Sequence, residues 1–466
     1  MYIVGREQEK HELNRLYTSN QSEFLAVYGR RRVGKTYLVR EFFKSKFAFY
    51  STGIARGSRK EQITQFYESL LEYGLSSDTP IPDNWHDAFR LLRQLLEKKR
   101  EKRKVIFLDE VPWMDTQKSD FLKAIDLFWN TWASARSDIF LIVCGSAASW
   151  MVKNLINNKG GLHNRLTCQL NILPFNLSET KDYLIRNGIK WTMQTIAECY
   201  MILGGIPYYL QQLDNSLSLA QNIDRLFFKD AALLKNEYKQ LYQSLFKASE
   251  DYVNIIQTLS QKRIGLTREQ ISHITKISNG GGLTRKLEEL EQCGFIRKYS
   301  AIGKREHIYQ LIDFFSIFYL TFIKKNKLSD TNAWMHMQGT AIHNNWLGFS
   351  FERICFAHLS QIRKSLGVSG VATRTFPLQT DNTQIDMLIE RADKTITVCE
   401  IKWSSTPYTI TKREMDKVLI RLQAARVAYP NHNVMLCFIT SHSLFRNQYS
   451  AENVHNTVML KDLFLA

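Results

Sequence analysis

The residues from Gly29 to Thr36 read GRRRVGKT and match the spacing G-x-x-x-x-G-K-[ST]. Loops of this kind curl so that their main-chain N–H groups point at phosphate oxygens. We expect Lys35 to reach the β- and γ-phosphates of a nucleotide and the Thr36 hydroxyl to bind Mg²⁺. The residues assigned to this cofactor site are Gly29, Arg30, Arg31, Arg32, Val33, Gly34, Lys35, Thr36 and Tyr37.

A second motif ends in two acids, in the run VIFLDEV from Val105 to Val111. Asp109 at the end of this expected strand is predicted to hold Mg²⁺. Glu110 is predicted to orient and deprotonate the attacking water. A buried strand that merely ends at a charged loop is the alternative. Because the acids follow the glycine-rich loop in the order that a nucleotide site requires, we favour that site.

Two further polar residues follow apolar segments. Ser146 ends the run IFLIVCGS and is a candidate for sensing the γ-phosphate, with a helix cap as the alternative. Arg165 precedes the next apolar run and is a candidate for stabilising the transferring phosphoryl group, within the chain or toward a neighbouring subunit. An ordinary surface arginine is an equally open interpretation of Arg165.

Near the C-terminus, Asp386, Glu400 and Lys402 have the spacing D-x13-E-x-K across two expected strands. Residues two apart on a strand leave the same face, and an acid on the neighbouring strand can meet them. Two carboxylates and a lysine can hold Mg²⁺ or Mn²⁺ and activate water for phosphodiester hydrolysis. Glu352 on a preceding helix is predicted to complete the metal shell. An inactive remnant of such a site and a chance spacing are the alternatives.

The elements that must position these residues alternate in the first 180 residues between apolar runs and helical patterns. That alternation predicts a parallel sheet covered by helices, and hence an α/β fold. At 466 residues the chain is too long for one ordinary core, and about 150 residues per domain suggests three domains, with two to four allowed. The expected strands are residues 24–28, 46–50, 105–111, 139–146 and 166–173.

The middle of the chain is helical, with a break at Gly204–Pro207, and predicts a small helical lid. Helices at 252–259, 267–274 and 283–290 then precede strands at 295–301 and 307–312, which flank a turn at Gly303. Three helices and a hairpin predict a winged helix-turn-helix. Leu283, Leu287 and Leu290 should be buried, whereas Thr284, Arg285 and Lys286 should face DNA. A protein-binding or lid role for this module is equally open.

The last part of the chain has the order αβββαβ. The expected elements are a helix at 351–359, strands at 371–378, 384–390 and 395–403, a helix at 411–428 and a strand at 433–440.

Composition limits the partners. Lys and Arg total 62 against 45 Asp and Glu, so the formal net charge is +17. This charge favours a polyanionic partner, although simple solubility is the other interpretation. The N-terminus lacks a signal peptide and no apolar run reaches the roughly 18 residues that span a bilayer, so we expect a cytoplasmic protein without a membrane partner. The scattered cysteines form no C-x-x-C pair and are expected to be buried and unpaired.

The opening segment Ile3–Glu7, the glycine-rich loop, LDEVPWMD, Leu173–Phe175 and the GGIP element together resemble the archaeal-type AAA ATPases, relatives of the STAND nucleotide switches. The resemblance covers roughly residues 1–320. It implies that Val4, Gly5 and Arg6 wrap the adenine side of ATP. It also implies that Gly205 and Pro207 of the lid face the base. The C-terminal acids within αβββαβ resemble the PD-(D/E)XK nuclease superfamily, whose domain recurs behind such ATPases.

These inferences predict four domains: a P-loop AAA ATPase domain at 1–178, a helical lid at 179–243, a winged helix domain at 244–328 and a restriction-endonuclease-like domain at 329–466. The predicted function is an ATP-driven, Mg²⁺-dependent switch that binds nucleic acid, with DNA favoured, and presents it to a metal-dependent nuclease. The alternative is a DNA-binding regulator or interaction protein with slow ATPase activity and an inactive nuclease-like domain. A nucleotide-dependent homo-oligomer, in which Arg165 acts across an interface, is a third reading.

Overall fold

The computed structural model describes residues 2–157, 164–246, 249–300, 306–325, 330–379 and 383–465. The chain contains two compact units, Met1–Pro174 and Phe175–Ala466. The finer boundaries predicted within the second unit stay predictions, and the one at 328/329 lies outside the described residues. Within the described ranges, no helix has the length and apolar character needed to cross a bilayer. The cysteines are free, and all but Cys168 are buried, as expected.

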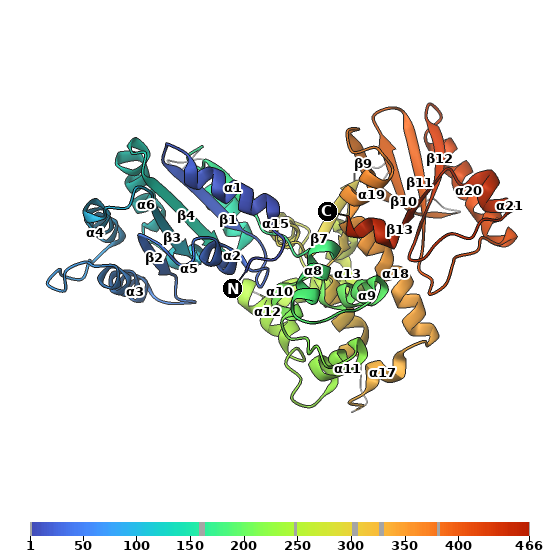
Figure 1. Cartoon of the computed structure of the whole chain (residues 1–466), viewed down its shortest axis with the longest axis horizontal. Helices are drawn as coiled ribbons and strands as arrows, with labels where there is room; N and C mark the ends of the chain where they lie inside the picture. The colour runs from blue at the N-terminus through green and yellow to red at the C-terminus, as the bar shows by residue number, and fades with distance from the viewer. Residues whose placement is uncertain are drawn as a thin grey trace. The chain divides into compact units, whose positions relative to one another are not determined.

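The first unit is built on a sheet with the strand order β2-β3-β4-β1-β5, in which every neighbouring pair is parallel. The residues of β3 and β4 are buried along their whole length, as expected for strands covered on both faces (Figure 1). The predicted parallel sheet is therefore confirmed. Its strands are β1 (Glu23–Tyr28), β2 (Phe49–Thr52), β3 (Lys104–Asp109), β4 (Ile139–Gly145) and β5 (Cys168–Asn171).

Helices connect these strands, and their starts follow local capping chemistry. The Ser58 side chain and Glu61 form a reciprocal capping box at the start of α3, and Asn84 caps α4. An aromatic core packs between the helices and the sheet, with the Trp85 and Phe121 ring centroids 4.9 Å apart. The helices are α1 (Glu7–Thr18), α2 (Lys35–Phe42), α3 (Arg59–Glu72), α4 (Trp85–Lys98), α5 (Val111–Met114), α6 (Phe121–Thr131) and α7 (Ala148–Met151).

The strands predicted at 46–50 and 166–173 differ most from the structure, and the one predicted at 105–111 already ends at Asp109. The strand predicted at 46–50 begins only at Phe49, because Lys44 and Ser45 adopt left-handed conformations that turn the chain after α2. The strand predicted at 166–173 is limited to Cys168–Asn171 by its pairing with β1. An apolar run therefore located each strand but not its ends.

The second unit begins with helices joined by tight turns. Gly205 has φ +65°, and a Cβ atom there would lie 2.2 Å from the Phe175 carbonyl oxygen, so the turn requires glycine. Pro207 then occupies the first position of α10, where its missing N–H costs nothing. These helices are α8 (Leu177–Arg186), α9 (Met193–Leu203), α10 (Pro207–Leu210), α11 (Leu219–Ile223) and α12 (Glu237–Leu245).

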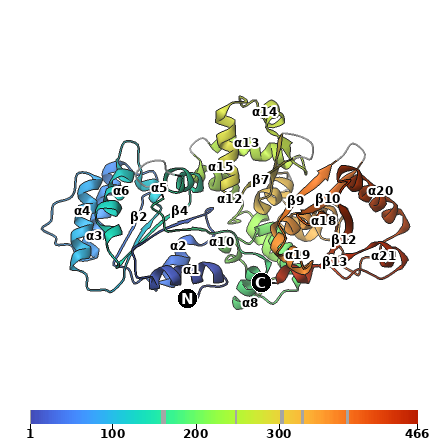
Figure 2. The same ribbon diagram turned by 90° about the horizontal axis from the view of Figure 1, so that it is seen from above.

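Three helices and a small antiparallel sheet follow, close together in Figure 2. Leu283, Leu287 and Leu290 are buried on α15, as predicted. The short strand β6 was not predicted; it pairs with β8, so the sheet order is β6-β8-β7. The predicted turn at Gly303 lies outside the described residues. The elements are α13 (Ser249–Ser260), β6 (Leu266–Thr267), α14 (Arg268–Thr275), α15 (Gly281–Gln292), β7 (Ile296–Ser300) and β8 (His307–Leu311).

The C-terminal sheet has the order β13-β12-β11-β10-β9. The pairs among β9, β10 and β11 are antiparallel, and those among β11, β12 and β13 are parallel. The helix α21 and the strand β13 were not predicted, because both are short and largely polar. The elements are α16 (Phe314–Phe318), α17 (Ala333–Met337), α18 (Ala341–Ala357), α19 (Leu359–Ser365), β9 (Thr373–Gln379), β10 (Gln384–Arg391), β11 (Thr395–Lys402), α20 (Lys412–Ala428), β12 (Asn433–Thr440), α21 (Gln448–Asn453) and β13 (Asn456–Met459).

Candidate functional site

The glycine-rich loop joins the end of β1 to the start of α2. Gly29 and Gly34 have φ values of +142° and +88°, which favour glycine at both ends of the loop. A Cβ atom on Gly29 would lie 2.3 Å from the Ile172 carbonyl oxygen, whereas one on Gly34 would meet nothing within 4 Å. Close backbone packing at Gly29 and open space at Gly34 are what a loop that cradles a phosphate requires.

The predicted metal ligands of the first unit meet across the sheet. The Thr36 hydroxyl donates a hydrogen bond of 2.8 Å to the Asp109 carboxylate. Asp109 is buried, and this burial raises the pKa of its carboxyl group, although the Thr36 hydrogen bond opposes the shift. A hydroxyl beside a carboxylate is an oxygen donor set of the kind that Mg²⁺ prefers, so these two residues fit the ion.

Lys35 folds back onto the loop that precedes it. Its ammonium group donates to the carbonyl oxygens of Gly29 and Arg30, at 3.0 and 2.9 Å, and the side chain is buried. In the part of the chain that the structure describes, no carboxylate forms an ion pair with Lys35. Among the described residues, the Lys35 ammonium group therefore bonds only neutral carbonyl groups, and its positive charge is available to bind an anionic ligand.

Glu110 directly follows β3 and has a left-handed backbone conformation. The backbone N–H and the hydroxyl of Ser146 both donate to one of its carboxylate oxygens, at 3.2 and 2.8 Å. The side chain of Ser146 thus bonds Glu110, whereas the following helix α7 has Ala147 at its N-cap and no side-chain cap. The predicted γ-phosphate sensor therefore positions the predicted base, and the alternative of a helix cap is wrong.

The N-terminal segment is attached to the loop through Arg6. This buried guanidinium donates to the carbonyl oxygens of Val33, at 3.3 Å, and Leu173, at 2.6 Å. Gly5 and Arg6 both have left-handed conformations, which bend the chain toward the loop. Among the other assigned loop residues, Arg30 is buried, Arg32 is half-buried, and Arg31 and Tyr37 are exposed.

The structure does not bring every predicted residue to this site. Arg165 is exposed in a turn before β5, and among the described residues no hydrogen bond or ion pair engages its guanidinium. Gly205 and Pro207 belong to the second unit. The proposed contacts of these three residues with the nucleotide therefore remain predictions.

The C-terminal acids come together on β10, β11 and α18. Met387 pairs with Cys399, so the antiparallel register places Asp386 beside Glu400 one step further along. Glu352 lies close enough to Asp386 that this carboxylate, together with burial, raises the pKa of Glu352, although nearby arginines oppose the shift. The predicted convergence of acids is therefore present in the second unit.

Cations contact all three acids, and the Ile401 N–H also donates to the Asp386 carboxylate at 3.3 Å. The Arg263 guanidinium pairs with Glu352 at 2.9 Å and with Asp386 at 3.3 Å. Lys402 lies 3.3 Å from the Glu400 carboxylate, and Arg421 also donates to it. Sequence reasoning missed both arginines. Arg421 lies on a predicted helix but matches no motif.

The metal site predicted from Glu352, Asp386 and Glu400 is not formed as a coordination site. Across the described ranges, no group of three or more His, Cys, Asp or Glu side chains could hold a metal ion as arranged. One Glu400 oxygen, Oε1, is nevertheless buried without a hydrogen-bond partner among the described residues. The carboxylates have the chemistry for Mg²⁺ or Mn²⁺, but the present arrangement pairs them with cations.

The N-terminal part of the chain is similar to a known family of ATPase domains. Residues 3–213 match the family model described as an ATPase domain predominantly from Archaea. An uncharacterized protein of Methanocaldococcus jannaschii is 23% identical over 415 residues, which cover 86% of this chain and 87% of that protein. An uncharacterized ATP-binding protein of the same organism is 42% identical over 44 residues, which cover 9% of this chain and 75% of that protein.

Among solved structures, the Walker-type ATPase of Pyrococcus abyssi is similar with a TM-score of 0.50. It is 17% identical, and the match covers 68% of this chain and 96% of that one. This likeness supports the fold, and the family match supports the activity. The N-terminal part of the chain is therefore similar to ATPase domains found predominantly in Archaea, and it has the fold of a P-loop ATPase.

Proposed function

We propose that the first unit binds and hydrolyses ATP at the loop from Gly29 to Thr36, and that the chain works as a nucleotide-dependent switch. The observation that carries this proposal is the hydrogen bond between Thr36 in the first turn of α2 and Asp109 at the end of β3. It brings the last residue of a phosphate loop to a buried acid, with Glu110 next in sequence. A hydroxyl and a carboxylate placed in this way can hold the Mg²⁺ ion that phosphoryl transfer requires.

The residues divide the work of hydrolysis. Lys35 holds the β- and γ-phosphates, while Thr36 and Asp109 hold Mg²⁺, which neutralises charge on the phosphate oxygens when bound. Glu110 orients the attacking water and accepts its proton. Ser146 fixes the Glu110 carboxylate through two hydrogen bonds and so acts as a positioning residue.

The remaining assigned residues act at the edges of this site. Gly5 and Arg6 shape the adenine side, and Arg6 also braces the loop through the Val33 carbonyl. Pro207 contributes to the base pocket from the lid. Arg165 stabilises transition-state charge, in the same chain or across a nucleotide-dependent oligomer.

Steady-state ATP hydrolysis tests the proposal. Glu110→Gln should bind ATP with nearly unchanged affinity and lose about 100-fold or more in rate, because the general base is removed. Lys35→Ala should lose nucleotide binding. The matched control is Glu68→Gln, which alters an exposed acid on α3. If Glu110→Gln hydrolyses ATP as fast as Glu68→Gln, the assigned base is wrong.

The second unit is proposed to comprise the lid, a winged helix domain at 244–328 and a nuclease-like domain at 329–466, and to bind nucleic acid, with DNA favoured. The net charge of +17 supports an anionic partner. On α15, Arg285 is exposed and lies 4.0 Å from the Glu289 carboxylate, whereas Thr284 accepts a hydrogen bond of 2.8 Å from Arg268 and Lys286 pairs with Asp251 at 3.3 Å. Arg285 is therefore the residue that we assign to DNA contact. A cytoplasmic location is proposed with this function.

A second candidate activity is metal-dependent DNA cleavage by Asp386, Glu400 and Lys402, with Glu352 completing the metal shell. The observation that favours it is the register that places Asp386 beside Glu400, with Lys402 pairing to Glu400. In this activity the acids would hold Mg²⁺ or Mn²⁺, and Lys402 would stabilise the charge that develops on the phosphate.

Nicking of plasmid DNA with Mg²⁺ or Mn²⁺ separates this activity from a regulatory role. Cleavage that Asp386→Asn abolishes, and that the exposed-site control Asp416→Asn leaves intact, supports a nuclease. If the protein nicks DNA in no nucleotide state, the alternative applies: a DNA-binding regulator or interaction protein with an inactive nuclease-like domain.

A further inference from the structure

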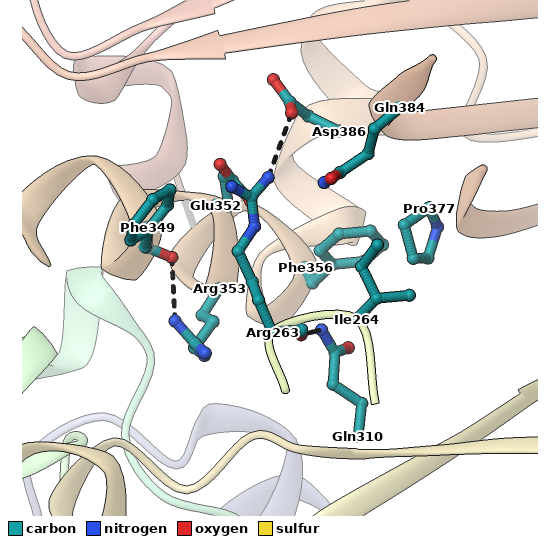
Figure 3. A pocket seen from close by; sticks show the side chains of 10 residues that line it. All are labelled: Arg263, Ile264, Gln310, Phe349, Glu352, Arg353, Phe356, Pro377, Gln384 and Asp386. Atoms are coloured by element: carbon teal, nitrogen blue, oxygen red, sulfur yellow. Dashed lines mark hydrogen bonds and ion pairs between the residues drawn. The ribbon is translucent and has the colours of Figure 1, made fainter. Parts of the chain in front are cut away.

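Arg263 crosses from the small antiparallel sheet to the acid cluster. It lies in the loop between α13 and β6, and its guanidinium pairs with Glu352 on α18 and Asp386 on β10. Figure 3 shows this side chain among the residues that line a pocket, with its guanidinium pointing toward Glu352 and Asp386. One cation therefore engages two of the three acids predicted to hold a metal ion.

Contacts with β8 and α18 hold Arg263 in this position. The Gln310 side-chain amide on β8 donates to the Arg263 carbonyl oxygen at 2.5 Å. The guanidinium carbon lies 4.6 Å from the centre of the Phe349 ring on α18. Gly265 has φ +105°, and a Cβ there would lie 2.3 Å from the Tyr309 carbonyl oxygen. These contacts place the Arg263 guanidinium beside the two acids.

The acids and their partners are balanced in charge. Glu352 and Asp386 share Arg263, while Glu400 is paired with Lys402 and Arg421. A divalent cation needs the same carboxylate oxygens that these cations hold. Glu400 Oε1, buried without a partner among the described residues, is an oxygen that this arrangement leaves unused.

We propose that Arg263 is an intramolecular plug that occupies the acid cluster in place of a divalent cation, so that a metal ion binds only when the loop withdraws. This inference rests on the proposed second activity and names its regulation. Because one guanidinium holds both Glu352 and Asp386, its departure frees two ligands at once. A movement of the loop between α13 and β6 would therefore free Glu352 and Asp386 next to the unpartnered Oε1 of Glu400.

Binding of Mn²⁺ to the full-length chain without nucleotide, followed by electron paramagnetic resonance, tests the plug. Arg263→Ala should bind Mn²⁺ at least tenfold more tightly than the wild type, and adding Asp386→Asn should remove this gain. Arg263→Gln should behave like Arg263→Ala, which guards against one variant that fails to fold. Arg263→Lys keeps the positive charge and should still exclude Mn²⁺. The neighbouring exposed residue gives the control Lys262→Ala, which should match the wild type.

The outcomes separate this inference from the activities on which it builds. Equal Mn²⁺ affinity in the wild type and in folded Arg263→Ala and Arg263→Gln overturns the plug, and so does a gain that survives Asp386→Asn. A gain that depends on Asp386, in a protein that never nicks DNA, supports the plug and removes the proposed cleavage. ATP hydrolysis should be unchanged in Arg263→Ala, because Arg263 belongs to the second unit and the proposed ATP site to the first.

Discussion

The two acid sites of this chain differ in the partners of their carboxylates. Asp109 and Glu110 receive hydrogen bonds from the neutral hydroxyls of Thr36 and Ser146. Glu352, Asp386 and Glu400, in contrast, are held by the cations Arg263, Lys402 and Arg421. Asp109, Asp386 and Glu400 are all buried on strands, so the partners rather than the burial distinguish the two sites.

This difference indicates which site can take a cation as it stands. A carboxylate bonded to a hydroxyl keeps its full negative charge, and the hydroxyl itself is a ligand for Mg²⁺. A carboxylate paired with arginine is already neutralised, and a metal ion must first displace that arginine. The acids of the proposed MgATP site therefore need lose no cation when Mg²⁺ binds, whereas those of the proposed second site must.

The largest expected effect comes from removing the hydrogen bond between Thr36 and Asp109 in the first unit. Thr36→Val keeps the side-chain shape but removes the hydroxyl, and Asp109→Asn removes the charge. Each should lower the rate of ATP hydrolysis by about 100- to 1,000-fold, because preorganised electrostatic stabilisation is lost. Steady-state kinetics measure this, with Thr131→Val at an exposed helix end as the control. A variant that stays within threefold of the wild type would show that the pair does not build the site.

The charged pairs of the second unit should instead control stability. Arg421→Met leaves the fully buried Glu400 with one cation fewer and should lower the free energy of unfolding by about 3 to 5 kcal/mol. The double variant Arg421→Met/Glu400→Met removes both charges and should recover most of this loss. Denaturant unfolding measures both variants. Additive losses would mean that the pair is not coupled in the folded protein.

Lowering the pH should destabilise the second unit through protonation of His358. The Leu177 N–H donates to His358 Nε2 at 2.9 Å, and burial lowers the pKa of this histidine to about 4. The unfolded chain binds the proton near pH 6.5, so stability from the neutral ring is complete above that pH and falls as the pH drops toward 4. The second unit should lose about 3 kcal/mol across this window.

Unfolding of His358→Gln between pH 7 and 4 checks this expectation, because the variant should lose that part of the pH dependence. His307→Gln, at an exposed position of β8, is the control and should follow the wild type. An unchanged pH profile in His358→Gln would assign the acid sensitivity to other groups.

The smallest effect is expected on the surface of α15. Arg285→Ala should weaken DNA binding by about three- to tenfold and reduce the slope of affinity against salt by about one, because one phosphate contact is lost. Fluorescence anisotropy at several salt concentrations measures both quantities. Arg413→Ala, at an exposed position of α20, provides the matched control. Equal losses in the two variants would indicate a general charge effect rather than a recognition helix.

The arrangement of the loop and the two acids in the first unit could be predicted because the residues of each motif are adjacent in the sequence. Residues 29–36 form one loop, and the acids at 109 and 110 directly end a strongly apolar strand, so the parallel sheet alone brings them together. The bond between Ser146 and Glu110 could be guessed for the same reason, since both follow buried strands. The strand ends were less certain because turns such as Lys44–Ser45 depend on tertiary packing.

The second site was only partly predictable. The register of β10 and β11 follows from a short turn, and it correctly joined Asp386 to Glu400. Arg263 is more than a hundred residues from Asp386 in the chain, and no local spacing connects the two. Its pairing arises from packing between the small sheet and the C-terminal region, which only a three-dimensional structure can reveal.

The central contrast is tested most directly by counting Mn²⁺ ions bound to the intact chain with a non-hydrolysable ATP analogue. We predict one nucleotide-dependent ion per chain, which Asp109→Asn removes and Asp386→Asn leaves unchanged. No bound ion in the presence of the nucleotide would contradict the account of the first unit. A second ion that Asp386→Asn removes from the otherwise unaltered chain would contradict the closed state of the second.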